Sequence, residues 1–165
     1  MTERFIIREL TKKDASTTYL SWFSQAEIKK YIENAPKTIA EIESYITLDQ
    51  KNSNILLLGI FSQKSHNHIG NIRYSYAYGG FDDVDMGIII GDERWRGKGV
   101  AQEVIVSTAE YLAEYNKTKK IILGVQKRNP SAIKAYEKIG FVTESILLPG
   151  DLEKEGLLMV WNLLR

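Results

Sequence analysis

The pattern of hydrophobic and polar positions predicts seven β-strands along the chain. The polar stretch between the second and third of them is typical of a β-hairpin turn. The predicted strands cover residues 3–9, 55–61, 68–78, 84–90, 120–125, 141–148 and 157–163.

Helical periodicity and capping residues predict helices between these strands. An early helix buries Leu20, Trp22 and Phe23. A capping box from Thr38 to Glu41 predicts a second helix that runs to about residue 49. Two further helices are expected over residues 97–115 and 130–139. The order is that of a mixed α/β protein, with antiparallel hairpins first and a βα crossover unit second.

Length and composition indicate one folded domain over residues 1–165. The chain is 44% hydrophobic and 26% charged, which is typical of a globular protein rather than a disordered one. Its net charge of +1 provides no bulk field for a nucleic acid or an anionic membrane. We therefore expect no nucleic-acid partner and no membrane partner, and any charged ligand must be bound by local groups.

The chain contains no cysteine, which excludes thiol nucleophiles, disulfides and cysteine-ligated zinc. The first residues lack the apolar core of a signal peptide, so the expected location is cytoplasmic. His66 and His68 fall in the polar hairpin turn without a third ligand nearby. We expect a solvated loop there and no metal site.

The fourth predicted strand runs directly into a basic turn that is rich in glycine. Gly97 and Gly99 precede a helix, so several backbone amides point outward at a helix N-terminus. Arg94, Arg96 and Lys98 add positive charge around these amides. The segment is therefore predicted to bind an anion, most naturally a phosphate.

Two known phosphate motifs fit this segment poorly. A P-loop needs Ser or Thr after Gly-Lys, whereas Lys98 is followed by Gly99. The dinucleotide fingerprint needs a small residue where Gln102 stands, and an acidic residue where Lys127 and Arg128 follow the next strand. A turn that merely joins a strand to a helix remains an alternative.

A second informative segment begins at Asn129. Asn129 suits the N-cap of a helix, Pro130 its first position and Gly140 its C-terminal cap. Tyr136 falls two turns into this helix. The helix follows the strand that we expect to lie beside the fourth strand, so the hydroxyl of Tyr136 is expected to face the phosphate turn.

Together the two segments resemble the GNAT superfamily of acetyl-CoA-dependent N-acetyltransferases. The family's pyrophosphate motif is met by Arg94, Gly97 and Gly99. Its later motif is met by Asn129, Tyr136, Gly140 and Phe141. The finer likeness is to the branch that acetylates ribosomal-protein N-termini, aminosugars and aminoglycosides, and it rests on Trp22, Glu27, Ile28 and Tyr31.

The resemblance implies the GNAT (acyl-CoA N-acyltransferase) fold, a mixed, mostly antiparallel seven-stranded sheet with flanking helices, as a monomer or homodimer. It also implies a metal-free reaction. The amine of a small molecule of the aminosugar type, or of a protein N-terminus, attacks acetyl-CoA directly. The alternative is a catalytically silent module of the same fold that binds CoA. The acceptor would be selected by residues 22–36 and 75–83, where tyrosines 74, 76 and 78 either stack on a sugar or cover the sheet.

The resemblance also implies the site residues. The pantetheine arm would lie along the fourth strand, and the pyrophosphate would bind the amides of the turn. The residues implied to hold acetyl-CoA are Ile88, Ile89, Ile90, Arg94, Arg96, Gly97, Lys98, Gly99, Val100, Ala101 and Asn129.

Two residues are implied in the chemistry. Tyr136, with an ordinary pKa near 10, would donate a proton to the leaving thiolate, whose pKa is about 8.5. Asp85 would act as the base through water or with a pKa raised by burial, or would steer a cationic amine. The alternatives are a packed aromatic ring for Tyr136 and a solvated acidic turn for Asp85.

Overall fold

The structure is a computed structural model that describes all residues except 1, 33, 77–81, 145–155 and 164–165. Its α-helices and 3₁₀ turns (η) are η1 (Lys12–Asp14), α1 (Thr17–Trp22), α2 (Ala26–Lys29), α3 (Ile39–Lys51), η2 (Glu93–Trp95), α4 (Val100–Tyr115) and α5 (Pro130–Ile139). Its strands are β1 (Phe5–Glu9), β2 (Ile55–Ser62), β3 (His68–Tyr76), β4 (Asp83–Ile90), β5 (Lys120–Gln126), β6 (Val142–Glu144) and β7 (Gly156–Asn162).

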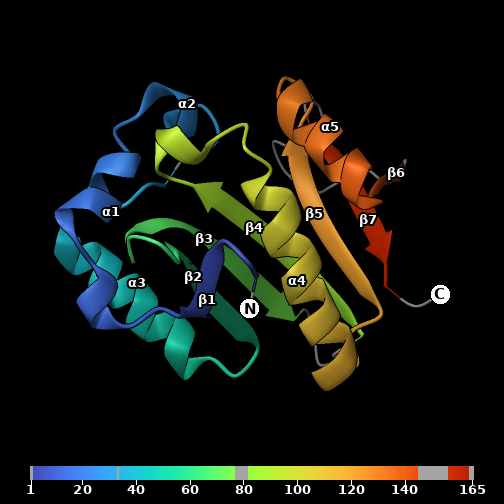
Figure 1. Cartoon of the computed structure of the whole chain (residues 1–165), viewed down its shortest axis with the longest axis horizontal. Helices are drawn as coiled ribbons and strands as arrows, with labels where there is room; N and C mark the ends of the chain where they lie inside the picture. Colours follow the sequence, from blue (N-terminus) through green and yellow to red (C-terminus); the bar gives the residue numbers. More distant parts are fainter. Residues whose placement is uncertain (1, 33, 77–81, 145–155, 164–165) are drawn as a thin grey trace. The chain divides into compact units, whose positions relative to one another are not determined.

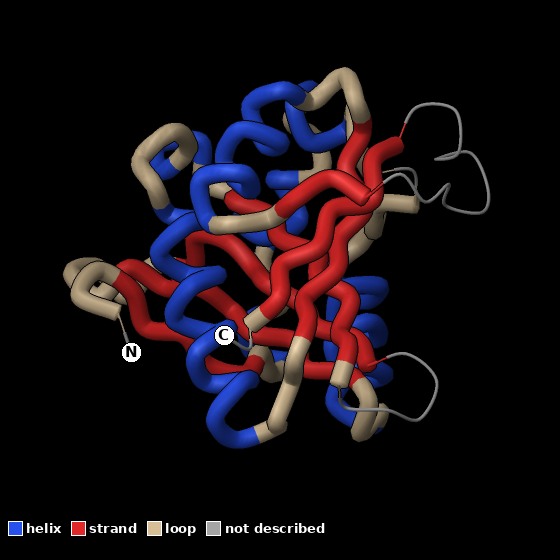
Figure 2. Tube along the Cα trace, turned by 90° about the vertical axis from the view of Figure 1, so that its right-hand side faces the viewer, coloured by secondary structure: helices blue, strands red, loops and turns tan. Residues whose placement is uncertain are grey.

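The strands form one seven-stranded sheet in the order β1-β2-β3-β4-β5-β7-β6. The pairs β1–β2, β5–β7 and β6–β7 are antiparallel, and β4–β5 is parallel. Figure 2 shows the strands in red with helices, in blue, at their flanks. The predicted mixed, mostly antiparallel sheet with flanking helices is confirmed.

The chain divides into two compact units, which are described separately. The first unit is Met1–Tyr74 with Ile88–Val100, and the second is Ser75–Gly87 with Ala101–Arg165. The expectation of one domain over residues 1–165 stays a prediction.

Helix α3 covers β2 in the first unit, and Figure 1 shows it on the flank of β1 and β2. Ile42 and Ile46 are four residues apart, so both point to the same side of the helix, and both are fully buried. They pack in one cluster with Leu57 and Phe61 of β2. Burial of each such side chain contributes roughly 1.5–3 kcal/mol, which makes this contact the main support of α3.

Both ends of α3 are fixed by side chains. The hydroxyl of Thr38 accepts a hydrogen bond from the Glu41 amide at 3.1 Å, as the capping box predicts. The Glu41 carboxylate accepts from the amide of Lys37 at 2.7 Å, one residue earlier than the box requires. At the other end, buried Asp49 accepts two hydrogen bonds from the Arg73 guanidinium, at 2.7 and 3.2 Å. Asp49 thereby anchors the last turns of α3 to β3.

The early helical segment consists of two short helices, α1 and α2. Tyr19 and Trp22 are buried, while Leu20 and Phe23 are only partly buried. The prediction of a buried Trp22 is therefore confirmed. Tyr19, which was not among the expected core residues, is buried as well.

The prediction that His68 lies in a solvated loop is wrong. Its ring stacks on Phe61 with centroids 4.7 Å apart, and it also contacts Tyr19 and Trp22. Its Nε2 lies 2.6 Å from the side-chain oxygen of buried Asn71. Burial lowers the pKa of His68, so the neutral ring is favoured. His66 is exposed, as predicted.

The second unit places β5 between β4 and β7. The β4–β5 ladder joins only Asp83–Asp85 to Lys120–Ile122, whereas β5 and β7 pair over the whole of both strands. This confirms that β5 lies beside β4. Helix α4 presents a buried face of Val104, Ile105, Ala109 and Leu112.

Candidate active site

The turn after β4, which is predicted to bind a phosphate, contains two glycines with positive φ. Asp92 caps η2 by accepting a hydrogen bond from the Arg94 amide at 3.0 Å. Gly97 and Gly99 then adopt left-handed conformations, with φ of 68° and 73°. Such angles cost a residue with a Cβ roughly 1–2 kcal/mol, which explains both glycines. A Cβ at Gly97 would meet no atom within 4 Å, so the space beside it is open.

The helix after this turn begins at Val100, not at residue 97 as predicted. Two left-handed residues cannot continue a right-handed helix, so Gly97 and Gly99 belong to the turn. The turn is also tied to β1. Arg4 donates a hydrogen bond to the Lys98 carbonyl at 3.0 Å, and Trp95 meets the ring of Phe5 edge-on at 5.3 Å.

Two of the three basic side chains of the turn are bound by groups of the chain itself. Arg94 donates two hydrogen bonds to the Asp92 carboxylate, at 3.0 and 2.7 Å, and these bonds hold the pKa of Asp92 below its usual value. Arg96 donates to the carbonyls of Ile90 and Gly91, at 2.9 and 3.1 Å, and to the side-chain oxygen of Gln25. Lys98 is exposed.

The end of β4 lies next to this turn in the first unit. Ile88, Ile89 and Ile90 are each partly buried. The carbonyl of Ile69 on β3 accepts hydrogen bonds from the amides of Gly91 and Asp92, at 2.9 and 3.0 Å. The strand end is therefore held on the β3 side.

Helix α5 carries the later motif in the second unit. The side-chain oxygen of Asn129 accepts from the Ala132 amide at 3.2 Å, Pro130 occupies the first turn, and Gly140 ends the helix at φ 121°. These predicted caps are confirmed. The contact predicted between Asn129 and the pantetheine arm stays a prediction.

Tyr136 on α5 packs against Phe141, with ring centroids 5.7 Å apart. Burial raises the pKa of Tyr136 to about 12, because a phenolate would lose its hydration there. The hydroxyl is therefore protonated throughout the neutral range, while the raised pKa makes it a weaker acid than an ordinary tyrosine.

Asp85 belongs to the paired part of β4, opposite Ile122. The side chain is exposed, yet the surrounding protein partly desolvates it and raises its pKa. A raised pKa is the direction that a base requires, although exposure keeps the effect small.

Both described tyrosines of β3 are core residues. Tyr74 is fully buried, and Tyr76 is 7% exposed, with its hydroxyl 3.3 Å from Thr118. They cover the sheet, which is one of the two alternatives given for them in the sequence analysis. Tyr78 lies outside the described residues. Two segments were expected to select the acceptor. Most of their described residues lie in 22–32 and 34–36.

Two features of the first unit had no signal in the sequence. A Cβ at Gly91 would lie 1.8 Å from the indole of Trp22, so glycine is required there by close packing. The side-chain amide of Gln25 donates a hydrogen bond to the carbonyl of Gly91, at the end of β4 and 66 residues away in the sequence. Local sequence patterns do not encode such distant partners.

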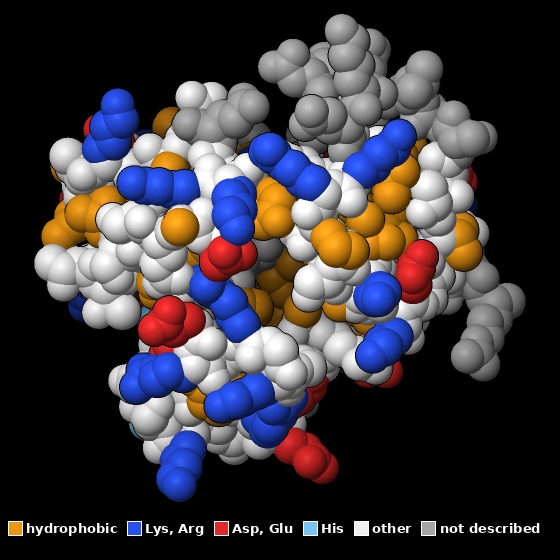
Figure 3. All heavy atoms as spheres, turned by 90° about the horizontal axis from the view of Figure 1, so that it is seen from above, with side chains coloured by type: hydrophobic (Ala, Val, Ile, Leu, Met, Phe, Trp, Pro, Cys, Tyr) orange, Lys and Arg blue, Asp and Glu red, His pale blue; other side chains and the backbone are white. Residues whose placement is uncertain are grey.

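The described part of the chain offers neither a metal cluster nor a membrane-spanning helix. No group of three or more His, Cys, Asp or Glu side chains is arranged there to hold a metal ion. No described helix combines the length and apolarity needed to span a membrane. On the face shown in Figure 3, lysine and arginine side chains are scattered among other groups rather than merged into one stripe.

Comparisons with known proteins place this geometry in a family. The model of the acetyltransferase (GNAT) domain matches residues 4–142. A spermine/spermidine N(1)-acetyltransferase of Bacillus subtilis is 38% identical over 50 residues, which span 30% of this chain and 33% of that protein.

Solved structures share the fold at low sequence identity. Spermidine N-acetyltransferase from Vibrio cholerae, in complex with CoA and spermine, superposes with a TM-score of 0.82 at 21% identity, over 96% of this chain and 95% of that one. A putative ribosomal-protein-serine acetyltransferase from Vibrio cholerae gives 0.81 at 16% identity, over 98% and 95%. With the family match over most of its length, the chain belongs to the GNAT acetyltransferase family.

Proposed function

We propose that the protein transfers the acetyl group of acetyl-CoA to a primary amine. The observation that carries this proposal is the turn at Gly97 and Gly99, whose left-handed glycines precede the N-terminus of α4 and leave open space beside Gly97. Successive backbone amides in such a turn favour an anion, here the pyrophosphate of CoA. The amides of residues 96–101 are proposed to bind it.

The proposed reaction is direct attack. The nitrogen of the neutral amine forms a bond to the thioester carbonyl carbon, and the carbon–sulfur bond then breaks. The sulfur leaves as a thiolate that accepts the proton of the Tyr136 hydroxyl, and the new amide loses one proton to water or to Asp85. The Tyr136 phenolate then regains a proton from water, so the products are the amide and the free thiol of CoA. Tyr136 is protonated at neutral pH and can donate at this step, and Asp85 is proposed to draw the cationic amine or its proton.

The pantetheine arm is proposed to lie along Ile88, Ile89 and Ile90, with Asn129 as a further partner. The short β4–β5 ladder, which ends at Asp85 and Ile122, supports this proposal because it pairs only the first part of β4 with β5.

The acceptor is proposed to be a small molecule with a primary amine. Polyamines are the first class to test, because the Bacillus subtilis relative and the Vibrio cholerae structure carry that activity in their names. Aminosugars and ribosomal-protein N-termini are the next classes.

The test is thiol release from acetyl-CoA in the presence of spermidine, an aminosugar, an aminoglycoside or a peptide N-terminus. Amine-dependent thiol release with one acetylated product supports the proposal. Tight CoA binding without turnover on any of these amines would instead favour the catalytically silent module. Failure to bind CoA would overturn both.

A further inference from the structure

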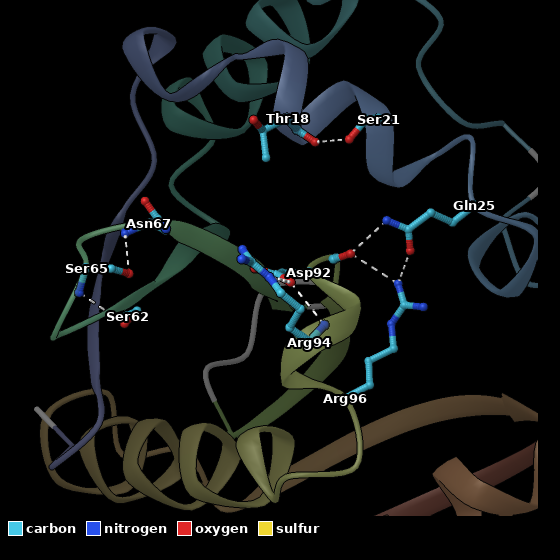
Figure 4. Close-up of polar contacts among 10 residues, drawn as sticks. Thr18, Ser21, Gln25, Ser62, Ser65, Asn67, Asp92, Arg94 and Arg96 are labelled. Carbon is cyan, nitrogen blue, oxygen red and sulfur yellow. Dashed lines mark hydrogen bonds and ion pairs between the residues drawn. The ribbon is translucent and has the colours of Figure 1, made fainter.

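Gln25 joins the segment between α1 and α2 to the end of β4. Its side-chain amide donates to the Gly91 carbonyl at 3.0 Å, and its side-chain oxygen accepts from Arg96. Arg96 also donates to the carbonyls of Gly91 and Ile90. Figure 4 shows Gln25 and Arg96 facing each other across this closed set of bonds.

A second contact holds the same two segments together. The indole of Trp22 lies so close to Gly91 that an added Cβ would sit 1.8 Å from its ring. The backbone N–H of Gln25 in turn donates to the Trp22 carbonyl at 3.1 Å. The ring of Trp22 and the side-chain amide of Gln25, which are close in sequence, therefore both contact Gly91 at the end of β4.

Arg96 is the side chain of the turn that reaches this stretch. Arg94 stays within the turn, on Asp92 two residues away. The guanidinium of Arg96 donates hydrogen bonds to two backbone carbonyls at the end of β4 and to the side-chain oxygen of Gln25, and its charge also acts on the carboxylates of Asp92 and Glu27. Its role in the structure is thus to position the start of the turn.

Helices α1 and α2 depend on such anchors for their order. They have six and four residues, and isolated helices of this length are unstable in water. A ligand that fixes the backbone of residues 96–99 also restricts the position from which the side chain of Arg96 reaches Gln25. The segment that the family resemblance links to acceptor selection is therefore attached to the turn proposed to bind CoA.

We infer that Gln25 is a positioning residue that couples cofactor binding at the turn of residues 96–99 to the order of α1 and α2. This inference rests on the proposed function, because it takes CoA as the ligand of the turn. Coupling is reciprocal, so an acceptor amine bound by the α1–α2 segment also binds more tightly when CoA is present.

The first test is hydrogen exchange of residues 17–30 with and without CoA. In the unmodified protein CoA should slow exchange there by roughly fivefold or more, the lower range of measured coupling between sites. Gln25→Met keeps the length of the side chain and removes both bonds, so the protection should disappear, and CoA affinity should fall by no more than about the same factor because the coupling is reciprocal.

Gln50→Met is the matched control. Gln50 also donates its side-chain amide to a carbonyl, that of Leu10 at 2.9 Å, and it belongs to α3 in the same unit. Its loss should leave the CoA-dependent protection intact. Gln25→Glu keeps an acceptor for Arg96 and should restore part of the protection. If Gln25→Met does not fold, Gln25→Asn provides a shorter amide for the same comparison.

The second test uses spermidine as the probe amine. Gln25→Met should raise the KM for spermidine roughly fivefold or more and leave kcat nearly unchanged, a split that loss of stability alone does not produce. Equal protection by CoA in Gln25→Met and the unmodified protein would overturn the inference alone. So would CoA binding without any protection of residues 17–30. An unmodified protein that fails to bind CoA would overturn the proposed function as well.

Discussion

The turn after β4 and the helix α5 carry the two halves of the GNAT motif, but they are held in opposite ways. Side chains from distant parts of the sequence hold the turn, namely Arg4 on Lys98 and Gln25 on Arg96. Helix α5 is bounded by its own residues, with Asn129 at one end and Gly140 at the other.

This difference predicts how the two regions respond to change. A locally capped helix keeps its conformation as long as its own cap residues remain. A turn held by distant partners loses its conformation when those partners are altered, even if its own sequence is intact. Changes in α5 should therefore affect the reaction, and changes around the turn should affect ligand binding.

The largest expected effect is that of Tyr136→Phe on α5. This change keeps the ring that packs on Phe141 and removes the proton donor, so the single-turnover rate should fall by roughly 10²-fold or more. Acetyl-CoA affinity, measured by calorimetry, should change far less. A single-turnover rate within about twofold of the unmodified protein would assign Tyr136 to packing alone.

A pair of glycine variants separates the two regions directly. Gly99→Ala places a Cβ at φ 73° in the turn, and Gly140→Ala places one at φ 121° and 3.0 Å from the Trp161 ring nitrogen. The strain at Gly99 corresponds to about a tenfold loss of CoA affinity if the turn relaxes out of its binding conformation.

Gly140→Ala should instead lower the free energy of unfolding by about 1–3 kcal/mol, with CoA affinity unchanged. Calorimetry and urea denaturation of both variants check the two expectations. A loss of CoA affinity in Gly140→Ala equal to that in Gly99→Ala would contradict the division between the regions.

Asp85→Asn tests the paired start of β4. Because partial desolvation raises the pKa of Asp85, the carboxylate forms only as the pH rises through that raised value, and a base must be deprotonated. The variant should lose several-fold in kcat/KM with the true acceptor, and the acidic limb of the pH profile due to Asp85 should vanish. An unchanged rate from pH 6 to 9 would show that water held by the backbone is the base.

The smallest expected effect is a loss of stability of the turn at acidic pH. The pKa of Asp92 is lowered by Arg94, so the stabilisation from this pair is present above the ordinary pKa of 3.8 and is lost as the pH falls through the lowered value. Because Arg94 is largely exposed and its charge is screened by solvent, the expected effect on stability is small. Helix α5 is capped by an amide that does not titrate.

Hydrogen exchange below pH 4 should therefore accelerate at residues 94–99 relative to residues 132–135. Asp92→Asn should abolish the difference in pH dependence. The same acceleration in both regions would indicate that acid acts on the whole molecule.

Elements with local signals could be predicted from the sequence. The bounds of α5 are those predicted, because Asn129, Pro130 and Gly140 act within the helix that they limit. The start of α4 was placed three residues early, because the pattern of apolar residues does not show that Gly97 and Gly99 have positive φ.

Long-range contacts could not be predicted. His68 was expected in solvent, but Phe61 and Trp22 enclose it from positions that the local pattern does not reveal. Gln25 was not singled out, because its partners Gly91 and Arg96 are 66 and 71 residues away. The residues of the turn could be identified from their sequence motif. The distant residues that hold the turn in place could be identified only from the structure.

The three tryptophans of the chain also give it built-in optical reporters. Two of them belong to the first unit: Trp22 packs against Gly91, and Trp95 packs against Phe5. The third, Trp161, packs against Phe141 and gives the fluorescence of the second unit. A Trp161→Phe variant therefore reports fluorescence from the first unit alone, and Trp22→Phe with Trp95→Phe from the second alone. Coincident emission changes in urea would show that the two units unfold as one cooperative domain, and separate midpoints would show two.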